Sequence, residues 1–246
     1  MNRKRVLVTG SSRGIGKAIA LKLADEGWSV AIHGSRPSAD CDSTAKELGD
    51  RRSGTYFADL ADPGSVPALF TEVVADGELD AVVNNAGVYV QQPFLADTHD
   101  FETAATLMFS VNFVSPVRLI RAAGRYFSEQ GGGKILNVAS RVGFRGEANA
   151  AMYAASKAAL INVTRSLAVE WATMNIGVFG MAPGWVDTAM VRDGMDERLA
   201  EILTTLPLGR MASPADCANV AAFLLSDGAA YLSGQTIDIN GASYFH

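Results

Sequence analysis

The chain has 246 residues, with 21 basic and 26 acidic side chains and a formal net charge of −5. A chain of this length can bury a large core without disulfides or a bound metal to stabilise it, and a hydrophobic share of 48% argues against disorder. No basic block or stripe occurs, so we expect no nucleic-acid partner.

The sequence predicts no targeting segment, no membrane span and no metal site. The apolar run 6–8 near the basic N-terminus is too short for a signal core, and no stretch approaches about 18 consecutive apolar residues. Cys41 and Cys217 are too far apart to indicate a disulfide framework or a metal knuckle. His33, His99 and His246 show no ligand spacing. We therefore expect a cytoplasmic protein.

Short β-branched runs alternate with longer helical segments along the chain. Strands are predicted over 5–9, 29–32, 54–57, 79–83, 134–138, 176–181 and 236–239. Helices are predicted over 15–26, 44–48, 65–75, 101–127, 150–172 and 215–225, with Pro116 marking a kink in the longest helix.

This alternation predicts an α/β fold with a doubly wound parallel sheet of about seven strands and helices on both faces. No linker or internal repeat divides the chain, so we expect one domain over residues 1–246. Segment 187–208 interrupts the alternation between the last two strands. Because insertions of this kind often lie over a site, we expect it to cover the substrate.

A glycine-rich turn joins the first predicted strand to the first helix. Its sequence, Thr9-Gly10-Ser11-Ser12-Arg13-Gly14-Ile15-Gly16, has the spacing G-x-x-x-G-x-G and matches neither the G-x-G-x-x-G form nor a Walker loop. Glycines let the backbone approach a pyrophosphate, and the helix N-terminus supplies free N–H groups. We interpret the turn as a nucleotide-binding loop, the alternative being an ordinary strand-to-helix turn.

The end of the second predicted strand indicates which nucleotide binds. It reads His33-Gly34-Ser35-Arg36 and lacks the acidic residue that would bind a ribose 2′-hydroxyl. Arg13 and Arg36 are candidates to pair with a 2′-phosphate, the alternative being two solvated arginines. The pattern favours NADP over NAD.

Three candidate catalytic residues lie between the fifth strand and the helix that follows it. Tyr153 and Lys157 are four residues apart and share a helix face, where an ammonium would lower the tyrosine pKa from about 10. Ser140 directly follows the fifth strand, at the sheet edge where ligands bind in this architecture. Arg141 and Arg145 come next. They would meet an anionic substrate group or lie in a solvated loop, and we prefer the solvated loop.

With these motifs in order, the chain resembles the short-chain dehydrogenase/reductase family, which has a Rossmann-type fold. The resemblance spans most of the chain. It is carried by Thr9–Gly16, Asp59, Asn84–Gly87, Asn112, Ser140, Tyr153-x-x-x-Lys157 and Pro183-Gly184.

The resemblance implies a role for each of these residues. Tyr153 would exchange a proton with the substrate oxygen, Ser140 would hydrogen-bond the same oxygen, and Lys157 would lower the tyrosine pKa and bind ribose hydroxyls. Asn112 would support a proton relay through water. The implied NADP(H)-binding residues are Gly10, Ser12, Arg13, Gly14, Ile15, Gly16, Arg36, Asp59, Leu60, Asn85, Ala86, Gly87, Tyr153, Lys157, Pro183, Gly184, Val186 and Thr188.

Within the family the chain looks most like bacterial 3-oxoacyl-[acyl-carrier-protein] reductases. This implies an NADPH-dependent ketoreductase of fatty acid biosynthesis that acts on a 3-oxoacyl thioester, with acyl carrier protein as a candidate partner, and that forms a homotetramer. One departure is that Trp171–Asn175 offers no basic residue to dock a carrier, although Arg121 and Arg125 are candidate substitutes. The alternatives are a reductase or dehydrogenase of another ketone, sugar or polyol, and a non-catalytic nucleotide sensor.

Overall fold

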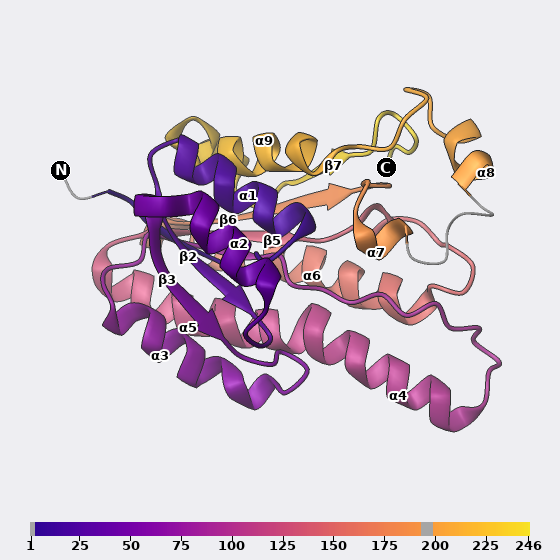
Figure 1. The fold of residues 1–246 in the computed structure, drawn as a ribbon, viewed down its shortest axis with the longest axis horizontal. Coiled ribbons are helices and arrows are strands. Elements are labelled where there is room, and N and C mark those ends of the chain that lie inside the picture. The colour runs from indigo at the N-terminus through magenta and orange to yellow at the C-terminus, as the bar shows by residue number, and fades with distance from the viewer. Residues whose placement is uncertain (1–2, 193–198) are drawn as a thin grey trace.

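A seven-stranded parallel sheet forms the centre of the protein in the computed structural model, which describes residues 3–192 and 199–246 (Figure 1). The strand order is β3-β2-β1-β4-β5-β6-β7, and every neighbouring pair is parallel. This confirms the predicted doubly wound sheet. The strands are β1 (Arg5–Val8), β2 (Ser29–Gly34), β3 (Arg52–Phe57), β4 (Ala81–Asn84), β5 (Gly133–Val138), β6 (Ile176–Pro183) and β7 (Thr236–Ile239).

Helices cover both faces of the sheet. One layer holds α1 (Gly14–Asp25), α2 (Ala39–Leu48) and α9 (Pro214–Leu225), and α1 packs against α9 (Figure 1). The opposite layer holds α3 (Val66–Ala75), α4 (Thr98–Phe109), α5 (Ser115–Gln130) and α6 (Ala151–Glu170). Short 3-10 turns occur at η1 (Gly49–Arg51), η2 (Pro63–Ser65), η4 (Arg141–Gly143), η5 (Ala172–Met174) and η6 (Asp227–Leu232).

The side chains of β1 show why the sheet needs both layers. Val6 and Val8 pack into the core on the α1 and α9 side, whereas Leu7 packs on the α3, α5 and α6 side. All three are fully buried. Since successive strand residues point to opposite faces, a strand that is apolar at every position must be covered on both faces.

The predicted helix over 101–127 is two helices joined by a π turn. This turn, η3 (Ser110–Val114), lies between α4 and α5, and Pro116 occupies the first turn of α5. The backbone is helical up to Val114, so Pro116 lies inside a continuous helix, and the Ser115 N–H donates to the Ser110 carbonyl across the π turn. Because a proline lacks an N–H and its ring clashes with the carbonyl four residues before it, a regular α turn cannot continue through Pro116. The irregularity that we expected at Pro116 therefore lies just before it, around Asn112.

The continuous helix Thr98–Gln130 is long and apolar enough to cross a membrane by length and composition, with a mean hydropathy of 1.3 in its most apolar window. A search for consecutive apolar residues overlooks it because polar residues interrupt the window. Half of that window is buried inside the protein, and α5 supplies Leu119, Ile120, Ala123 and Phe127 to the core. It is a core helix of the fold.

Segment 187–208 contains two short helices, α7 (Ala189–Arg192) and α8 (Leu199–Thr204). Residues 193–198 of this segment lie outside the described part of the chain. Ile202 and Leu206 form a small apolar cluster with Met211 and Trp185, separate from the two main cores.

Candidate active site

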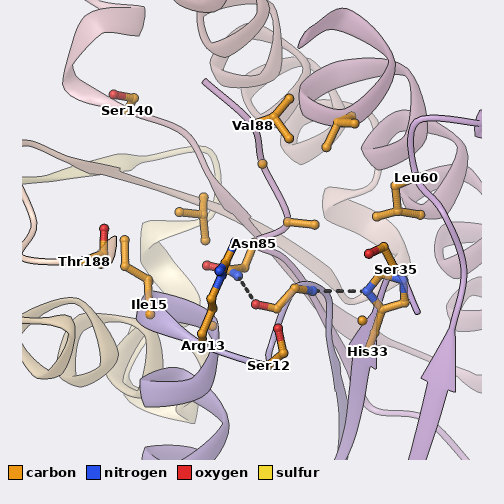
Figure 2. Close-up of a pocket in the computed structure, with 18 of the residues that line it drawn as sticks. Ser12, Arg13, Ile15, His33, Ser35, Leu60, Asn85, Val88, Ser140 and Thr188 are labelled. Atoms are coloured by element: carbon orange, nitrogen blue, oxygen red, sulfur yellow. Dashed lines mark hydrogen bonds between the residues drawn. The ribbon is translucent and has the colours of Figure 1, made fainter. Parts of the chain in front are cut away.

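A cleft of about 440 Å³ lies where β1, β2, β4, β5 and β6 end (Figure 2). This is the carboxyl edge of the sheet, where open α/β folds bind ligands. Residues that are far apart in the sequence meet there because the strands that precede them are neighbours. The predicted site residues that line it are Gly10, Ser12, Arg13, Gly14, Ile15, Gly16, Asp59, Leu60, Asn85, Ala86, Gly87, Ser140, Tyr153, Lys157, Pro183, Gly184, Val186 and Thr188.

Two glycines of the turn after β1 allow close backbone packing. Gly10 has a φ of +62°, and a Cβ there would lie 2.8 Å from the Cα of Ala86. A Cβ at Gly16 would overlap the carbonyl oxygen of Gly10. The Asn85 side chain donates hydrogen bonds to the carbonyls of Thr9 and Gly10, at 2.9 and 3.1 Å. The turn is therefore fixed by direct contact with the chain that leaves β4.

The N-terminus of α1 fits a phosphate group. Its N-cap residue, Arg13, has an extended backbone and makes no side-chain cap, and the first turn holds no acidic residue. The first N–H groups of a helix lack partners within the helix and attract anions. Since Arg13, Gly14 and Ile15 line the cleft, these groups are placed to hold the pyrophosphate of a dinucleotide.

His33, at the end of β2, holds the same turn from the other side, as Figure 2 shows. Its Nδ1 accepts a hydrogen bond from the Gly10 N–H at 3.1 Å, and its Nε2 lies 3.1 Å from the Ala58 carbonyl oxygen. The imidazole therefore carries its proton on Nε2 and is neutral. Burial lowers its pKa to about 4.

Ser140, Tyr153 and Lys157 come together at the far end of the cleft. Burial raises the pKa of Tyr153 to about 12, and a hydrogen bond with Ser140 acts in the opposite direction. Burial lowers the pKa of Lys157 to about 8. Its Nζ donates to the Val138 carbonyl at 2.9 Å and lies 5.8 Å from the centre of the Tyr153 ring. Burial, rather than the Lys157 ammonium, therefore sets the phenol pKa in this arrangement.

Asn112 lies in the π turn, fully buried, and its side chain is occupied. Its Oδ1 accepts from the Val88 N–H at 2.9 Å, and its Nδ2 donates to the Val88 carbonyl at the same distance. The Nδ2 also lies 3.3 Å from the Ser156 hydroxyl on α6. The side chain thus ties the segment that follows β4 to the helix of Tyr153, and it does not line the cleft.

Arg36 is exposed and lies outside the cleft lining, so its contact with a 2′-phosphate stays a prediction. Arg141 is only 5% exposed, and our preference for a solvated loop at this residue was wrong. The cleft also has lining residues that the sequence analysis did not single out for binding: His33, Gly34, Ser35, Ala58, Ala61, Val88, Leu107, Val111, Val138, Ala139 and Ala189.

Comparison with known proteins gives three informative relatives. The 3-oxoacyl-[acyl-carrier-protein] reductase FabG of Staphylococcus aureus is 37% identical over 244 residues, which cover 98% of each chain. The structure of a putative NAD(P)-dependent gluconate 5-dehydrogenase from Beutenbergia cavernae, with bound NADP at low occupancy, has a TM-score of 0.91 at 36% identity. It covers 98% of this chain and 96% of that one. The structure of 3-oxoacyl (acyl-carrier-protein) reductase from Agrobacterium tumefaciens C58 with NADP bound has a TM-score of 0.90 at 29% identity, covering 97% and 93%.

A family model described as enoyl-(acyl carrier protein) reductase matches residues 10–242, nearly the whole chain. This match and the full-length relatives agree with the order of motifs and with the cleft at the carboxyl edge of the sheet. The chain belongs to the short-chain dehydrogenase/reductase family of NAD(P)-dependent oxidoreductases.

Proposed function

We propose that the protein reduces a ketone to a secondary alcohol with NADPH, and that its substrate is a 3-oxoacyl thioester. The observation that carries this proposal is the meeting of Ser140, Tyr153 and Lys157 in the cleft that the phosphate loop also lines. A nucleotide sensor would need the loop but no proton donor beside it.

Tyr153 is the proton donor of the proposed reaction. Because its pKa is about 12, the phenol is protonated at neutral pH, as an acid catalyst must be. The substrate carbonyl oxygen accepts hydrogen bonds from Tyr153 and Ser140. NADPH supplies the hydride when bound. As the carbonyl carbon gains the hydride, its oxygen takes the C=O electron pair and then the proton of Tyr153. The Lys157 ammonium stabilises the phenolate that remains.

Residues around the phosphate loop would hold NADPH. The N–H groups at the start of α1 would face the pyrophosphate, and residues 35–38, directly after β2, include no carboxylate that would compete with a 2′-phosphate. Ser35 lines the cleft beside His33, and Arg13 lines it from the loop. The NADP bound to the Agrobacterium tumefaciens relative supports the same preference. Arg36 would reach the 2′-phosphate from the rim.

The similarity to FabG supports a 3-oxoacyl thioester as substrate. Three arginines, Arg118, Arg121 and Arg125, are exposed along α5 at helical spacing. They would dock an acidic carrier protein in place of the basic residues that Trp171–Asn175 lacks. Segment 187–208 would cover the acyl chain, because Thr188 and Ala189 near its start line the cleft.

The second candidate substrate is a sugar acid or polyol, a class suggested by the putative gluconate 5-dehydrogenase, which is about as similar in sequence as FabG. The same three catalytic residues would serve it. We also propose that the chain forms a homotetramer. Large apolar side chains on α6, α9 and η6 that are exposed in the single chain would be covered by its neighbours: Val169, Phe223 and Tyr231.

The first test is the oxidation of NADPH and of NADH by the purified protein with acetoacetyl-CoA, 5-ketogluconate and a panel of polyols. Turnover of acetoacetyl-CoA with preference for NADPH supports the proposal. Turnover of 5-ketogluconate without turnover of acetoacetyl-CoA would show that the substrate is of the second class, a sugar acid or polyol. The double substitution Arg121→Glu and Arg125→Glu should raise KM for acetoacetyl-carrier protein and leave KM for acetoacetyl-CoA unchanged. Light scattering measures the oligomeric state.

A further inference from the structure

Ser140 begins a short turn that rests directly on the helix of Tyr153. Its hydroxyl accepts from the Val142 N–H at 3.4 Å, and its carbonyl accepts from the Gly143 N–H at 2.9 Å. Gly143 approaches α6 so closely that a Cβ there would lie 2.7 Å from Ile161 and 3.1 Å from the backbone nitrogen of Ala158. The conformation of this turn, η4, therefore sets where the Ser140 hydroxyl lies relative to Tyr153.

Arg141, the residue after Ser140, has a buried guanidinium group that contacts three other segments of the chain. Nη2 lies 3.3 Å from Oε2 of Glu147, which precedes α6, and Nη1 donates to the Ser243 hydroxyl in the C-terminal segment at 3.2 Å. The Cζ lies 5.7 Å from the centre of the Trp185 ring, which follows β6. One side chain thus links the Ser140 turn to the start of α6, to the end of β6 and to the C-terminal segment.

A buried guanidinium is costly unless its geometry is well satisfied. Here burial, and then the nearby Arg145, lower the pKa of Arg141, and Glu147 is the carboxylate that opposes them. Its Nε is buried and has no hydrogen-bond partner among the described residues. An apolar side chain would fill such a position at less cost if packing were the only requirement.

Trp185 extends this link toward the substrate side. It packs with Ile202 and Leu206, in and just after α8, and it stands between the cleft residues Gly184 and Val186. The planar guanidinium of Arg141 lies against the same indole ring. Arg141 therefore contacts the residue that joins the Ser140 side of the cleft to segment 187–208.

We propose that Arg141 is a positioning residue for reduction: its contacts with Glu147, Trp185 and Ser243 hold the Ser140 hydroxyl at the distance from Tyr153 that the substrate oxygen needs. The inference rests on the proposed roles of Ser140 and Tyr153. Arg141 itself touches neither substrate nor cofactor. Small displacements of positioned groups reduce rates strongly, so the effect should be on kcat.

The first experiment compares Arg141→Met with wild type in kcat, KM and NADPH dissociation constant. We expect kcat to fall about tenfold or more, and NADPH affinity to stay within about twofold, because the phosphate loop follows a different strand. Arg141→Lys keeps the positive charge but lacks the planar guanidinium with its several N–H donors, so it should retain only part of the wild-type kcat. Arg165→Met is the matched control. This exposed arginine lies over the Phe144 ring of the same loop, and its loss should change kcat by less than twofold.

A purely structural role would give a different pattern. If Arg141→Met lowers the melting temperature but keeps kcat within twofold, the inference is overturned. Should this variant fail to fold, Glu147→Gln and Ser243→Ala each weaken or remove one contact, and both should lower kcat about threefold with unchanged NADPH affinity. Unchanged kcat in both also overturns it.

A second readout is independent of the substrate. Crystal structures of wild type and Arg141→Met with NADPH give the distance between the Ser140 hydroxyl oxygen and the Tyr153 phenol oxygen. A changed distance in the variant supports the inference, and the same distance in both proteins overturns it. If wild type fails to reduce acetoacetyl-CoA, the proposed substrate is wrong, but these structures still decide the role of Arg141.

Discussion

The bridge made by His33 predicts that the fold loses stability in acid. The pKa of His33 in the folded protein sets how much free energy of unfolding is lost. The unfolded chain binds a proton at the ordinary histidine pKa of 6.5, whereas the folded protein binds it only at about 4. Between these values the unfolded state holds more protons, so the free energy of unfolding decreases as the pH falls from about 6.5 to 4. The difference between the two pKa values corresponds to about 3 kcal/mol, and the loss ends below pH 4.

The substitution His33→Asn should remove this pH dependence. An asparagine Oδ1 is placed to keep the hydrogen bond from the Gly10 N–H, while the titratable ring is gone. Urea unfolding at fixed protein concentration, in steps from pH 7.5 to 4, gives the free energy of both proteins. Other groups titrate in both, so the informative quantity is the difference between the two curves. That difference should change by about 3 kcal/mol in favour of the variant.

The exposed His99 provides the control, because His99→Asn removes a histidine without a buried ring. Its curve should run parallel to that of wild type. Parallel curves for wild type and His33→Asn would refute the reasoning, since they would mean that His33 titrates alike in the folded and unfolded states. NMR of the His33 ring protons down to pH 4 would then measure the pKa of His33 in the folded protein and show whether it is lowered.

Three further predictions concern activity. Tyr153→Phe should lower kcat by about 10²- to 10⁴-fold with NADPH binding retained, as measured by steady-state kinetics and NADPH fluorescence. Because Lys157 has a pKa of about 8, reduction should decline above pH 8 as its ammonium loses the proton, and Lys157→Arg should move this limb of the pH–rate profile upward. Gly10→Ala should weaken NADPH binding at least tenfold, while Gly27→Ala, which also has a positive φ but open space around it, should not.

The parts of the structure that sequence reasoning predicted are those that a local pattern specifies. Short apolar runs separated by helical segments imply a parallel sheet with two helical layers, and the glycines of 10–16 imply a tight strand-to-helix turn. The helix over Ala39–Leu48 was predicted too short, because its N-cap, Ser38, lies within a polar segment that reads as a loop. The π turn has no such signal, since Ser110–Val114 contains neither the glycine nor the proline that would mark a break in a helix.

Charge and protonation were harder to predict because they depend on burial. The four-residue spacing of Tyr153 and Lys157 correctly suggests a shared helix face, but it carries no information on desolvation. Lys157 is buried and Tyr153 is partly buried, and desolvation favours the neutral form of each: it raises the pKa of the phenol and lowers that of the ammonium. The spacing alone suggested that the phenol pKa would fall.

The bridging roles of His33 and Arg141 were missed for the same reason. Each residue lies at or just after the carboxyl end of a strand, in a segment that composition identifies as a polar loop. In a parallel sheet all such ends meet at one edge, so a polar side chain there is surrounded by segments distant in sequence. His33 meets the turn after β1 and the segment after β3, and Arg141 meets the segment after β6 and the chain beyond β7. A polar residue that follows a strand in this fold is therefore not solvated by default, since Arg141 is buried whereas Arg36 is exposed. The two arms of each bridge can be tested by separate substitutions.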